Sequence, residues 1–444
     1  MVRMAGMGRS SRIGCVFWLD AEIAHGNGAG ASGGPAGPAQ RPISHVDSNA
    51  HAPDKGPARP RTRLRRWIGE KRGRLDTTAS YERAGAVLTV DLAAIATNYC
   101  ALRARLGGAE CAAVVKADAY GLGAAEVAPV LAAAGCRNFF VAHVEEGLAL
   151  RAALGERAEI LVLNGLPPGA EADCAAAGLV PVINSLEQLS AWRATARGEK
   201  LPAALQIDTG MSRLGLCEPD IARIADDPTL LAGIAPRLVM SHLACADEPA
   251  HPANERQRAT FERLRGLLPP MRASLANSPG IFLGPAYHFD MARPGAALYG
   301  VNPTPGAPNP MRPVVTLSAK IIQLHDVPAG TGVGYGHDFL AERPTRLATI
   351  ALGYADGWHR RSGAAAFWKG TRLQLAGRVS MDSMTLDVSA LPAGSLVPGD
   401  LVDLICAEQP VDDVAMAAGT IGYEVLTSLG HRFHRRYVGA TERT

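Results

Sequence analysis

Residues 112–123 read AAVVKADAYGLG, a short apolar run that ends in a lysine. An uninterrupted apolar run of this kind is typical of a strand buried on both faces of a parallel sheet. A lysine directly after such a strand projects from the rim of the sheet, where barrel enzymes place their active sites. Because burial of an ammonium group is costly, Lys116 is expected to have a depressed pKa or a covalent partner, and both suit Schiff-base chemistry with an aldehyde cofactor. On the strand alone a salt-bridged lysine is the simpler interpretation, but Tyr120 and two nearby glycines add a hydroxyl group and close backbone approach to a phosphate.

Outward from this segment, short apolar runs alternate with amphipathic stretches. A helix is expected over residues 90–106, with Asp91 as its N-terminal cap. Eight strand-like runs follow, and they are Cys111–Val115, Asn138–Ala142, Ile160–Leu163, Val180–Ile183, Ala203–Ile207, Leu238–Ser241, Ser274–Asn277 and a weaker run that ends near Met291. Buried strands that alternate with helices indicate a parallel sheet, and eight units in about 210 residues favour a closed (β/α)8 TIM-type barrel over an open sheet.

The composition changes beyond Pro303, where PTPGAPNP (303–310) reads as a linker. Alternating and β-branched segments follow, and they are Val314–Leu324, Arg346–Leu352, Arg372–Val379, Met384–Val388 and Leu401–Ile405. These segments predict an antiparallel or mixed sheet, with helices near 411–418 and 421–429 covering part of it. We therefore expect a barrel domain over residues 85–310 and a mainly β C-terminal domain over residues 311–444.

The first 84 residues differ in composition from the rest of the chain. Residues 1–83 hold 14 Lys and Arg against 7 Asp and Glu, whereas the remaining residues hold 31 against 35. By itself, the basic run RTRLRR (61–66) is compatible with a nucleic-acid or membrane contact. The surrounding Gly, Pro and Ser residues favour a disordered, solvated extension over residues 1–84, so neither kind of partner is expected. A transit peptide, or a start codon assigned too far upstream, would also account for it.

Cysteine and hydropathy patterns limit the class of protein. The eight cysteines are scattered and none forms a CxxC pair, which favours a reducing compartment and predicts no metal-ligand cluster. The sequence has no run of about 18 apolar residues, so no transmembrane helix is expected. We expect a cytoplasmic protein without a bound metal.

A series of motifs resembles the alanine racemase family. Residues 115–121, VKADAYG, are similar to the family's attachment site for pyridoxal 5′-phosphate (PLP). Further family-like motifs follow in the expected order: DTGMSRLG (208–215), SHLA (241–244), ANS (276–278), ARPG (292–295), GYG (334–336), GYADG (353–357), GRVSMD (377–382) and GYE (422–424). Nine motifs in order across two domains are far more specific than any one of them.

The resemblance implies two opposed proton-transfer groups. Lys116 would hold PLP covalently until the substrate amine displaces it, and would then act as the base for the D-enantiomer. Tyr335 would lie on the opposite face of the substrate and act on the L-enantiomer, because a single base that returns its own proton retains configuration. A tyrosine usually titrates near about pH 10, so this role implies cationic neighbours or hydrogen bonds that favour the phenolate. Taken alone, Gly-Tyr-Gly is an ordinary turn sequence.

The resemblance also implies a cofactor site in the barrel. Arg293 would face the pyridine nitrogen, where many PLP enzymes place a carboxylate. A guanidinium cannot accept the proton of that nitrogen, so the ring becomes a weaker electron sink, which suits racemisation and disfavours transamination. His242 would orient this arginine. The phosphate would be bound at the loops after strands seven and eight by Ser278, Gly295, Ala296, Tyr120 and Tyr423.

The remaining family-like residues concern the substrate. Arg213 and the backbone of Met381 would contact the substrate carboxylate. Four others resemble residues of the family's access channel, although each is equally compatible with an ordinary surface pair: Tyr354, Asp247, Arg360 and Arg378. One position departs from the family, because a lysine, carbamylated in some members, often stands where this chain has Gln206. Carbamylation is excluded there, so either the amide of Gln206 or another anion would have to steady Arg213.

The expected activity is the interconversion of L-alanine and D-alanine, with D-alanine supplied for bacterial peptidoglycan. In the family the β domain of one subunit completes the barrel site of the other, so the resemblance implies a head-to-tail homodimer with shared sites. Alternatives are a racemase of broader or different specificity (serine or lysine), a PLP decarboxylase and a non-catalytic PLP carrier. Arg293 counts against the decarboxylase, which usually binds the ring nitrogen with a carboxylate. A carrier would not need the β domain with Tyr335.

Overall fold

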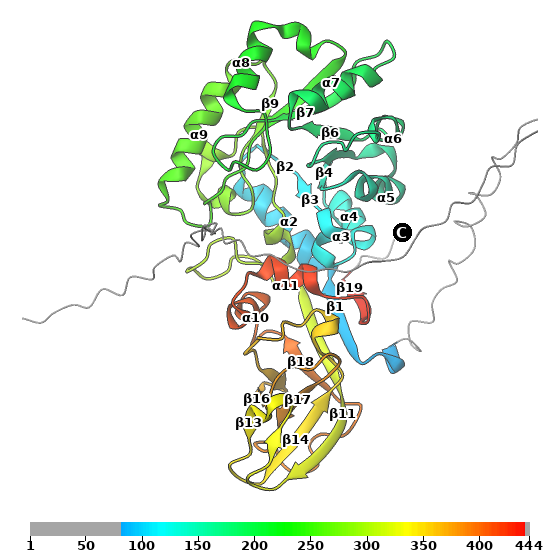
Figure 1. Cartoon of the computed structure of the whole chain (residues 1–444), viewed down its shortest axis with the longest axis vertical. Helices are drawn as coiled ribbons and strands as arrows, with labels where there is room; N and C mark the ends of the chain where they lie inside the picture. Colours follow the sequence, from blue (N-terminus) through cyan, green and yellow to red (C-terminus); the bar gives the residue numbers. More distant parts are fainter. Residues whose placement is uncertain (1–80, 440–444) are drawn as a thin grey trace, which may run out of the picture. The chain divides into compact units, whose positions relative to one another are not determined.

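The computed structural model describes residues 81–439 of the chain. In this part, parallel strands form a sheet of β2 (Glu110–Cys111), β3 (Ala113–Val114), β4 (Asn138–Val141), β5 (Glu159–Val162), β6 (Val180–Ile183), β7 (Leu201–Gln206), β8 (Ile234–Met240), β9 (Arg272–Ser274) and β10 (Met291–Ala292). β2 and β3 are consecutive pieces of one strand position, of which β2 pairs with β10 and β3 pairs with β4. The sheet therefore closes into the predicted eight-position barrel (Figure 1).

The apolar runs make up the barrel wall because both faces of each strand are covered. Phe139, Ile160 and Val182 have no exposed surface, and burial of each such side chain contributes about 1.5–3 kcal/mol. At the closure, the Ala112 N–H donates to the Ala292 carbonyl at 2.9 Å, and the Val115 N–H donates to the Phe140 carbonyl at 2.8 Å. Lys116 therefore follows the first strand position, at the closure where that strand is hydrogen-bonded to the second and the eighth.

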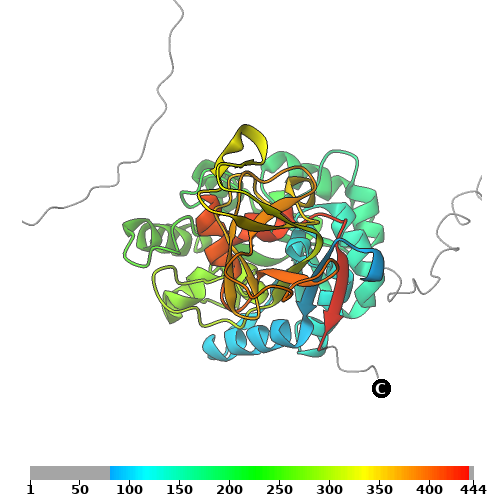
Figure 2. The same ribbon diagram turned by 90° about the horizontal axis from the view of Figure 1, so that it is seen from below.

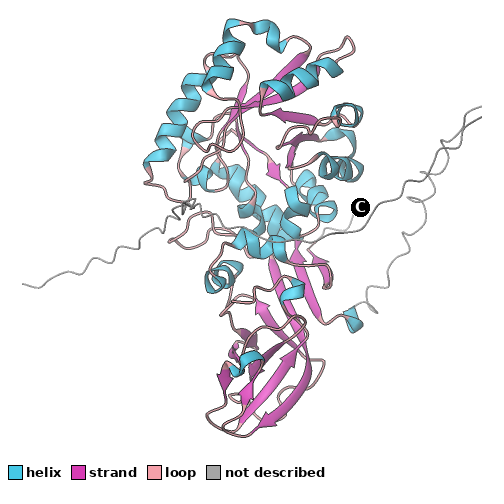
Figure 3. Cartoon of the chain, in the orientation of Figure 1, coloured by secondary structure: helices cyan, strands magenta, loops and turns pink. Residues whose placement is uncertain are grey.

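Helices surround the strands, as the alternating pattern predicts (Figures 2 and 3). They are α2 (Leu92–Arg105), α3 (Lys116–Gly121), α4 (Ala124–Ala133), α5 (Val144–Leu154), α6 (Glu171–Ala176), α7 (Leu186–Thr195), α8 (Glu218–Asp226) and α9 (Pro252–Arg265). The predicted N-terminal cap is confirmed, since Asp91 Oδ1 accepts a hydrogen bond from the Ala94 N–H at 2.9 Å. The short 3-10 helix Ala296–Tyr299 follows β10.

The second domain is a mostly antiparallel sheet ordered β14-β17-β16-β15-β18-β11-β1-β19. Its strands are β1 (Ala86–Asp91), β11 (Val315–Val327), β14 (Thr345–Ile350), β15 (Ala366–Trp368), β16 (Thr371–Leu375), β17 (Met384–Asp387), β18 (Leu401–Ile405) and β19 (His434–Val438). A bulge between Ile321 and Gln323 lets β11 pair with β1 and β18 along its first half and mainly with β14 along its second. A hairpin of β12 (Gly332–Val333) and β13 (Phe339–Leu340) and the helices α10 (Val411–Ala418) and α11 (Gly422–Ser428) complete the domain.

The structure differs from the sequence-based division at the start of the barrel. The sequence assigns residues 86–91 to the barrel domain, whereas β1 pairs antiparallel with β11 and parallel with β19. The boundaries at residues 84 and 310 stay a prediction. The proposed extension over residues 1–84 lies almost wholly outside the described residues. Between residues 81 and 439, no helix is both long and apolar enough to cross a bilayer.

Candidate active site

Lys116 begins α3, and the backbone after it has an uncommon conformation. Ala117, Asp118, Ala119 and Tyr120 are all left-handed, with φ between 53° and 57°. For residues with a β-carbon this region costs roughly 1–2 kcal/mol per residue, and runs of it are rare. Such strain is retained only where the surroundings fix it, and it is concentrated at functional sites. The turn sets the direction in which Lys116 leaves the barrel.

The Lys116 amine lies among cationic groups at this rim. Burial lowers the pKa of Lys116, the nearby guanidinium of Arg213 lowers it further, and the carboxylate of Glu146 acts in the opposite direction. The pKa of His242 falls to about 3 because its ring is desolvated and lies near Arg293, Arg213 and Lys116. His242 is therefore a neutral imidazole, and Lys116 is biased towards the neutral, nucleophilic amine.

Arg293 is 3% exposed and lacks a carboxylate partner among the described residues. Its terminal nitrogens donate to Ser274 Oγ, to the Ser241 carbonyl at 2.6 Å and to the Leu275 carbonyl at 3.5 Å. Burial lowers the pKa of this guanidinium to about 9. In residues 81–439 its Nε makes no hydrogen bond, and no hydrogen bond joins it to His242. The backbone of Ser241 and the Ser274 hydroxyl, rather than the His242 ring, hold Arg293 in place.

Hydroxyl donors gather at the loops that follow the last two barrel strands. Ser278 Oγ accepts hydrogen bonds from the Gly295 N–H at 3.0 Å and the Ala297 N–H at 3.2 Å, so its own hydrogen is free to donate elsewhere. A β-carbon at Gly295 would clash with the Tyr120 hydroxyl oxygen, which places that phenol against the same loop. The rings of Tyr120 and Tyr423 are 6.2 Å apart. The sequence does not predict the hydrogen bond from the Ala297 N–H to Ser278.

Both phenols remain protonated donors at neutral pH. Burial raises the pKa of Tyr120 above its usual range, and burial followed by the charge of Asp247 raises that of Tyr423 to about 12. Asp247, predicted for the access channel, is thus a neighbour of Tyr423. Neither phenolic oxygen has a hydrogen-bond partner in the described part of the chain. These three hydroxyl donors fit an anionic group such as a phosphate.

Arg213 lies on the loop after β7. The carboxylate of Asp208 fixes this loop, because Oδ1 accepts from the N–H groups of Gly210, Met211 and Ser212 at 2.9–3.1 Å. Gln206 is 7% exposed and its Nε2 donates to the Leu214 carbonyl at 3.1 Å. Over residues 81–439 no hydrogen bond or ion pair joins Gln206 to Arg213. Gln206 therefore supports the backbone beside Arg213, which is itself an exposed residue.

Tyr335 belongs to a separate hollow in the β domain. It is 66% exposed and begins the 3-10 turn Tyr335–His337, and its two neighbours, Gly334 and Gly336, both have positive φ. The hollow has a volume of about 490 Å³ and is lined by Gly334, Tyr335, Ser380, Met381, Asp382 and Ser383. Every lining residue comes from the β domain and none from the barrel. Within one chain, the structure does not bring Tyr335 into the group that contains Lys116.

The loop that carries Met381 is held by an ion-pair network that the sequence does not predict. Arg432 donates to both carboxylate oxygens of Asp356 at 2.6 and 2.9 Å and to Asp382 at 2.7 Å. The Asp356 side chain is only 7% exposed, so this arginine compensates a buried charge. No described residue accepts a hydrogen bond from the Met381 N–H, which leaves that donor open to a ligand.

The other predicted channel residues lie apart from the barrel group. The Tyr354 N–H donates to the Ser380 carbonyl at 3.0 Å, so Tyr354 adjoins the Met381 loop. Arg378 forms an ion pair with Asp338 at 2.6 Å and lies beside Gly336, close to Tyr335. Arg360 is exposed and makes no side-chain hydrogen bond in the described part of the chain. In residues 81–439, no group of three His, Cys, Asp or Glu side chains is arranged to hold a metal ion.

Comparison with known proteins matches both domains. Residues 90–303 match the alanine racemase N-terminal domain, and residues 314–437 match the alanine racemase C-terminal domain. The chain belongs to the alanine racemase family. A protein named "Alanine racemase, catabolic" from Mesorhizobium japonicum is 61% identical over 358 residues, or 80% of this chain and 94% of that protein. The alanine racemase of Brucella canis is 51% identical over 372 residues, or 80% of this chain and 94% of that protein.

Solved structures of the family agree with the fold. The alanine racemase of Bartonella henselae, described with covalently bound pyridoxal phosphate, is 42% identical with a TM-score of 0.77, covering 80% of this chain and all of that one. The biosynthetic alanine racemase of Pseudomonas aeruginosa is 39% identical with a TM-score of 0.74, covering 80% and 99% of the two chains. Family members are PLP-dependent isomerases, and the hydroxyl groups of Ser278, Tyr120 and Tyr423 are compatible with the phosphate of that cofactor.

Proposed function

We propose that this protein racemises alanine with PLP bound in the barrel and the reacting carbon held between Lys116 and Tyr335. The single observation that carries the proposal is the composition of the barrel rim, where Lys116 and the buried Arg293, which has no carboxylate partner among the described residues, both lie near His242. PLP, when bound, supplies the electron-withdrawing ring that acidifies the α-carbon of an amino acid. Cofactor binding, substrate binding and proton transfer are all assigned to residues of this chain.

The cofactor would be held by groups that are already oriented. Ser278, Tyr120 and Tyr423 would donate hydroxyl hydrogens to the phosphate, and the N–H groups of the turn at 295–297 would line the same oxygens. Arg293 would donate its unused Nε–H to the ring nitrogen. Because a guanidinium keeps its own protons, the ring nitrogen would stay unprotonated, which disfavours decarboxylation and transamination relative to simple proton exchange.

Proton transfer would use one group on each face of the substrate. Lys116 Nζ would accept or return the α-proton on one side and Tyr335 Oη on the other, which inverts configuration. Arg213 and the open N–H of Met381 would bind the substrate carboxylate and fix which face meets which base. Because the His242 imidazole is neutral, it would add no further positive charge beside Arg293 and Lys116.

A homodimer with shared sites is part of the proposal. Tyr335 and Met381 line a hollow built from the β domain alone, whereas Lys116 and Arg213 lie at the rim of the barrel. A site that needs all four is completed when the β domain of one subunit covers the barrel of its partner. The exposure of Tyr335 and Met381, at 66% and 53%, is then accounted for by burial in the dimer.

The first test is chemical. Purified protein supplied with PLP and then treated with borohydride should carry the cofactor on Lys116, as read by peptide mass spectrometry. In deuterated water it should exchange the α-hydrogen of alanine and interconvert the enantiomers on a chiral column. Serine and lysine measured alongside would show whether specificity is broad. Cofactor on Lys116 without α-hydrogen exchange would favour the PLP carrier and refute the racemase.

The physiological role is a separate proposal. Supply of D-alanine for peptidoglycan follows from the family resemblance, whereas the names of two relatives, at 61% and 53% identity, include the word catabolic and favour use of alanine as a nutrient. Deletion of the gene distinguishes the two, because loss of supply creates a requirement for D-alanine and loss of catabolism prevents growth on alanine. All seven described cysteines are free, which supports a cytoplasmic location.

A further inference from the structure

The left-handed turn after Lys116 is fixed by a carboxylate from the neighbouring barrel unit. Glu146 lies in the first turn of α5, and its Oε1 accepts a hydrogen bond from the Ala117 N–H at 2.7 Å. Its other oxygen accepts from the N–H groups of Ala142 at 2.7 Å and His143 at 3.2 Å. One side chain therefore ties the residue after Lys116 to the loop that follows β4. Hydrogen bonds to an ionised carboxylate are among the stronger ones in proteins.

The other contacts that hold the turn act farther from Lys116. Asp118 Oδ1 accepts from the Ala124 N–H at 2.7 Å and so caps α4. From β19, Arg435 donates to the Gly121 carbonyl at 2.6 Å and the Tyr437 hydroxyl donates to the Leu122 carbonyl at 3.0 Å. Among the described residues, Glu146 supplies the one side-chain hydrogen bond to the N–H that follows Lys116.

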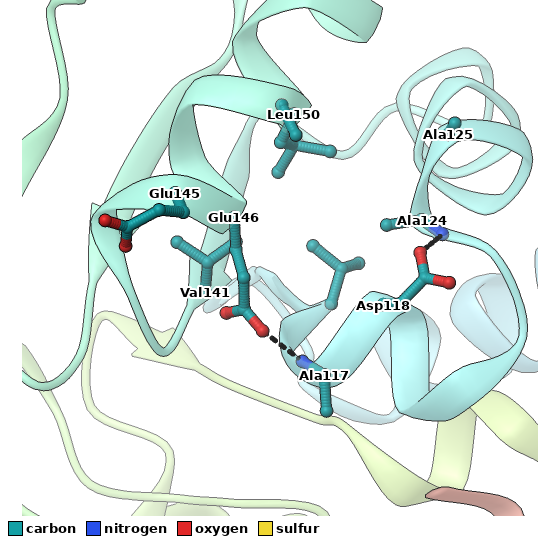
Figure 4. Close-up of a pocket in the computed structure, with 10 residues that line it drawn as sticks. Ala117, Asp118, Ala124, Ala125, Val141, Glu145, Glu146 and Leu150 are labelled. Carbon is teal, nitrogen blue, oxygen red and sulfur yellow. Dashed lines mark hydrogen bonds between the residues drawn. The ribbon is translucent and has the colours of Figure 1, made fainter.

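Packing does not replace this hydrogen bond. A cavity of about 540 Å³ lies against the turn and is lined in part by Val115, Ala117, Asp118, Glu145 and Glu146 (Figure 4). On this side the strained backbone borders open space instead of close-packed side chains, which alone would resist relaxation. At Ala117, beside the cavity, the carboxylate of Glu146 is therefore the contact that holds the turn, whereas Ala119 and Tyr120 farther along it are buried.

We propose that Glu146 is a positioning residue for Lys116, whose carboxylate holds the left-handed turn and thereby aims the amine into the barrel mouth. The proposal rests on the role of Lys116 given above. Electrostatics support the same assignment, because the negative charge of Glu146 partly offsets the burial and the Arg213 charge that lower the pKa of Lys116. His242, the remaining titratable group that couples to this amine, stays neutral.

The test compares E146Q with E145Q in the full-length protein. Glu145 precedes Glu146 on the same helix, is exposed, and its side chain makes no hydrogen bond to a described residue, so E145Q removes the same charge without touching the turn. In E146Q one oxygen becomes an NH2 group, which cannot accept a hydrogen bond. The side chain therefore loses either its bond from the Ala117 N–H or its bonds from the N–H groups of Ala142 and His143. Each variant is first freed of cofactor and is then supplied with PLP. The rate at which PLP attaches to Lys116 is followed by borohydride trapping and peptide mass spectrometry.

E146Q should capture PLP about tenfold or more slowly, the equivalent of one charged hydrogen bond, and should lose kcat with little change in KM. E145Q should stay within about twofold of the parent. Wild-type capture rate and kcat in E146Q would overturn the proposal, even if its melting temperature fell. Should E146Q not fold, E146D, which keeps the charge but is too short to span both N–H groups, is measured instead, and parent-like capture by it has the same meaning. If the parent itself never carries PLP on Lys116, the proposed function fails, and this inference fails with it.

Discussion

Mixing two inactive variants tests whether each site is built from two subunits. In Lys116→Ala the phenol hollow is intact, and in Tyr335→Phe the barrel group is intact, because the lining of the two has no residue in common. Random exchange of equal amounts gives two-fold dimers of which about one half are hybrids. In each hybrid one site combines the intact lysine with the intact tyrosine, and the other lacks both. The mixture should therefore recover about one quarter of the parent activity per chain.

The assay needs proof of exchange as well as activity. Two affinity tags isolate the hybrid dimers, and chiral chromatography measures their conversion of L-alanine, which should be about half that of the parent dimer. A chain with both substitutions is the control. Mixed equally with the parent, it should leave about half of the input activity, because neither site of its hybrids is complete. Tagged hybrids that form in the expected amount yet show no activity would refute shared sites.

Three further outcomes follow from the same contacts. Lys116→Met should raise the melting temperature of the cofactor-free protein at neutral pH. The folded-state pKa of this lysine is lowered, so its penalty is complete below that pKa and should vanish as the pH approaches the ordinary lysine value of about 10.5, which thermal melts across that range would show. Ser278→Ala leaves the N–H groups of Gly295 and Ala297 without their acceptor and should lower the free energy of unfolding by roughly 2–4 kcal/mol in urea titrations, with weaker PLP binding by fluorescence. Arg432→Gln should raise the KM for alanine severalfold while PLP capture in the barrel stays unchanged, because it releases the Met381 loop; equal loss of both would contradict the division into two half-sites.

The barrel could be predicted from the sequence because its strands are apolar on both faces. Continuous apolar runs such as 138–142 and 180–183 indicate strands that are covered on both faces. The last strands are only two or three residues long, and their weak signal corresponds to β9 and β10. β1 and β19 were not predicted. They pair in the sheet although they lie at opposite ends of the described chain, so no turn sequence joins them and marks the pair.

The candidate site could be predicted in its residue types but not in its supports. Lys116, Arg293 and Ser278 are marked by motifs that include their neighbours in sequence. Arg432 forms ion pairs with Asp356 and Asp382 from a distant part of the chain, and no sequence motif indicates them. The left-handed run from Ala117 to Tyr120 was equally hidden, because alanine and tyrosine do not favour that conformation and tertiary contacts impose it.

The pairing of β1 with β11 and β19 limits how this chain can be divided. A fragment that ends at the linker near residue 310 would keep β1 but lose both strands that flank it, so an apolar edge would be exposed to other molecules. Such a fragment should self-associate even though its barrel strands are complete. Residues 81 and 439 lie at opposite ends of the parallel pair β1 and β19, because Tyr81 packs on His434 whereas Gly439 lies beside Asp91. A peptide long enough to run back along β19, combined with an opening of the chain at the linker, would instead preserve the full β sheet, so such a circular permutant should not self-associate as the fragment does.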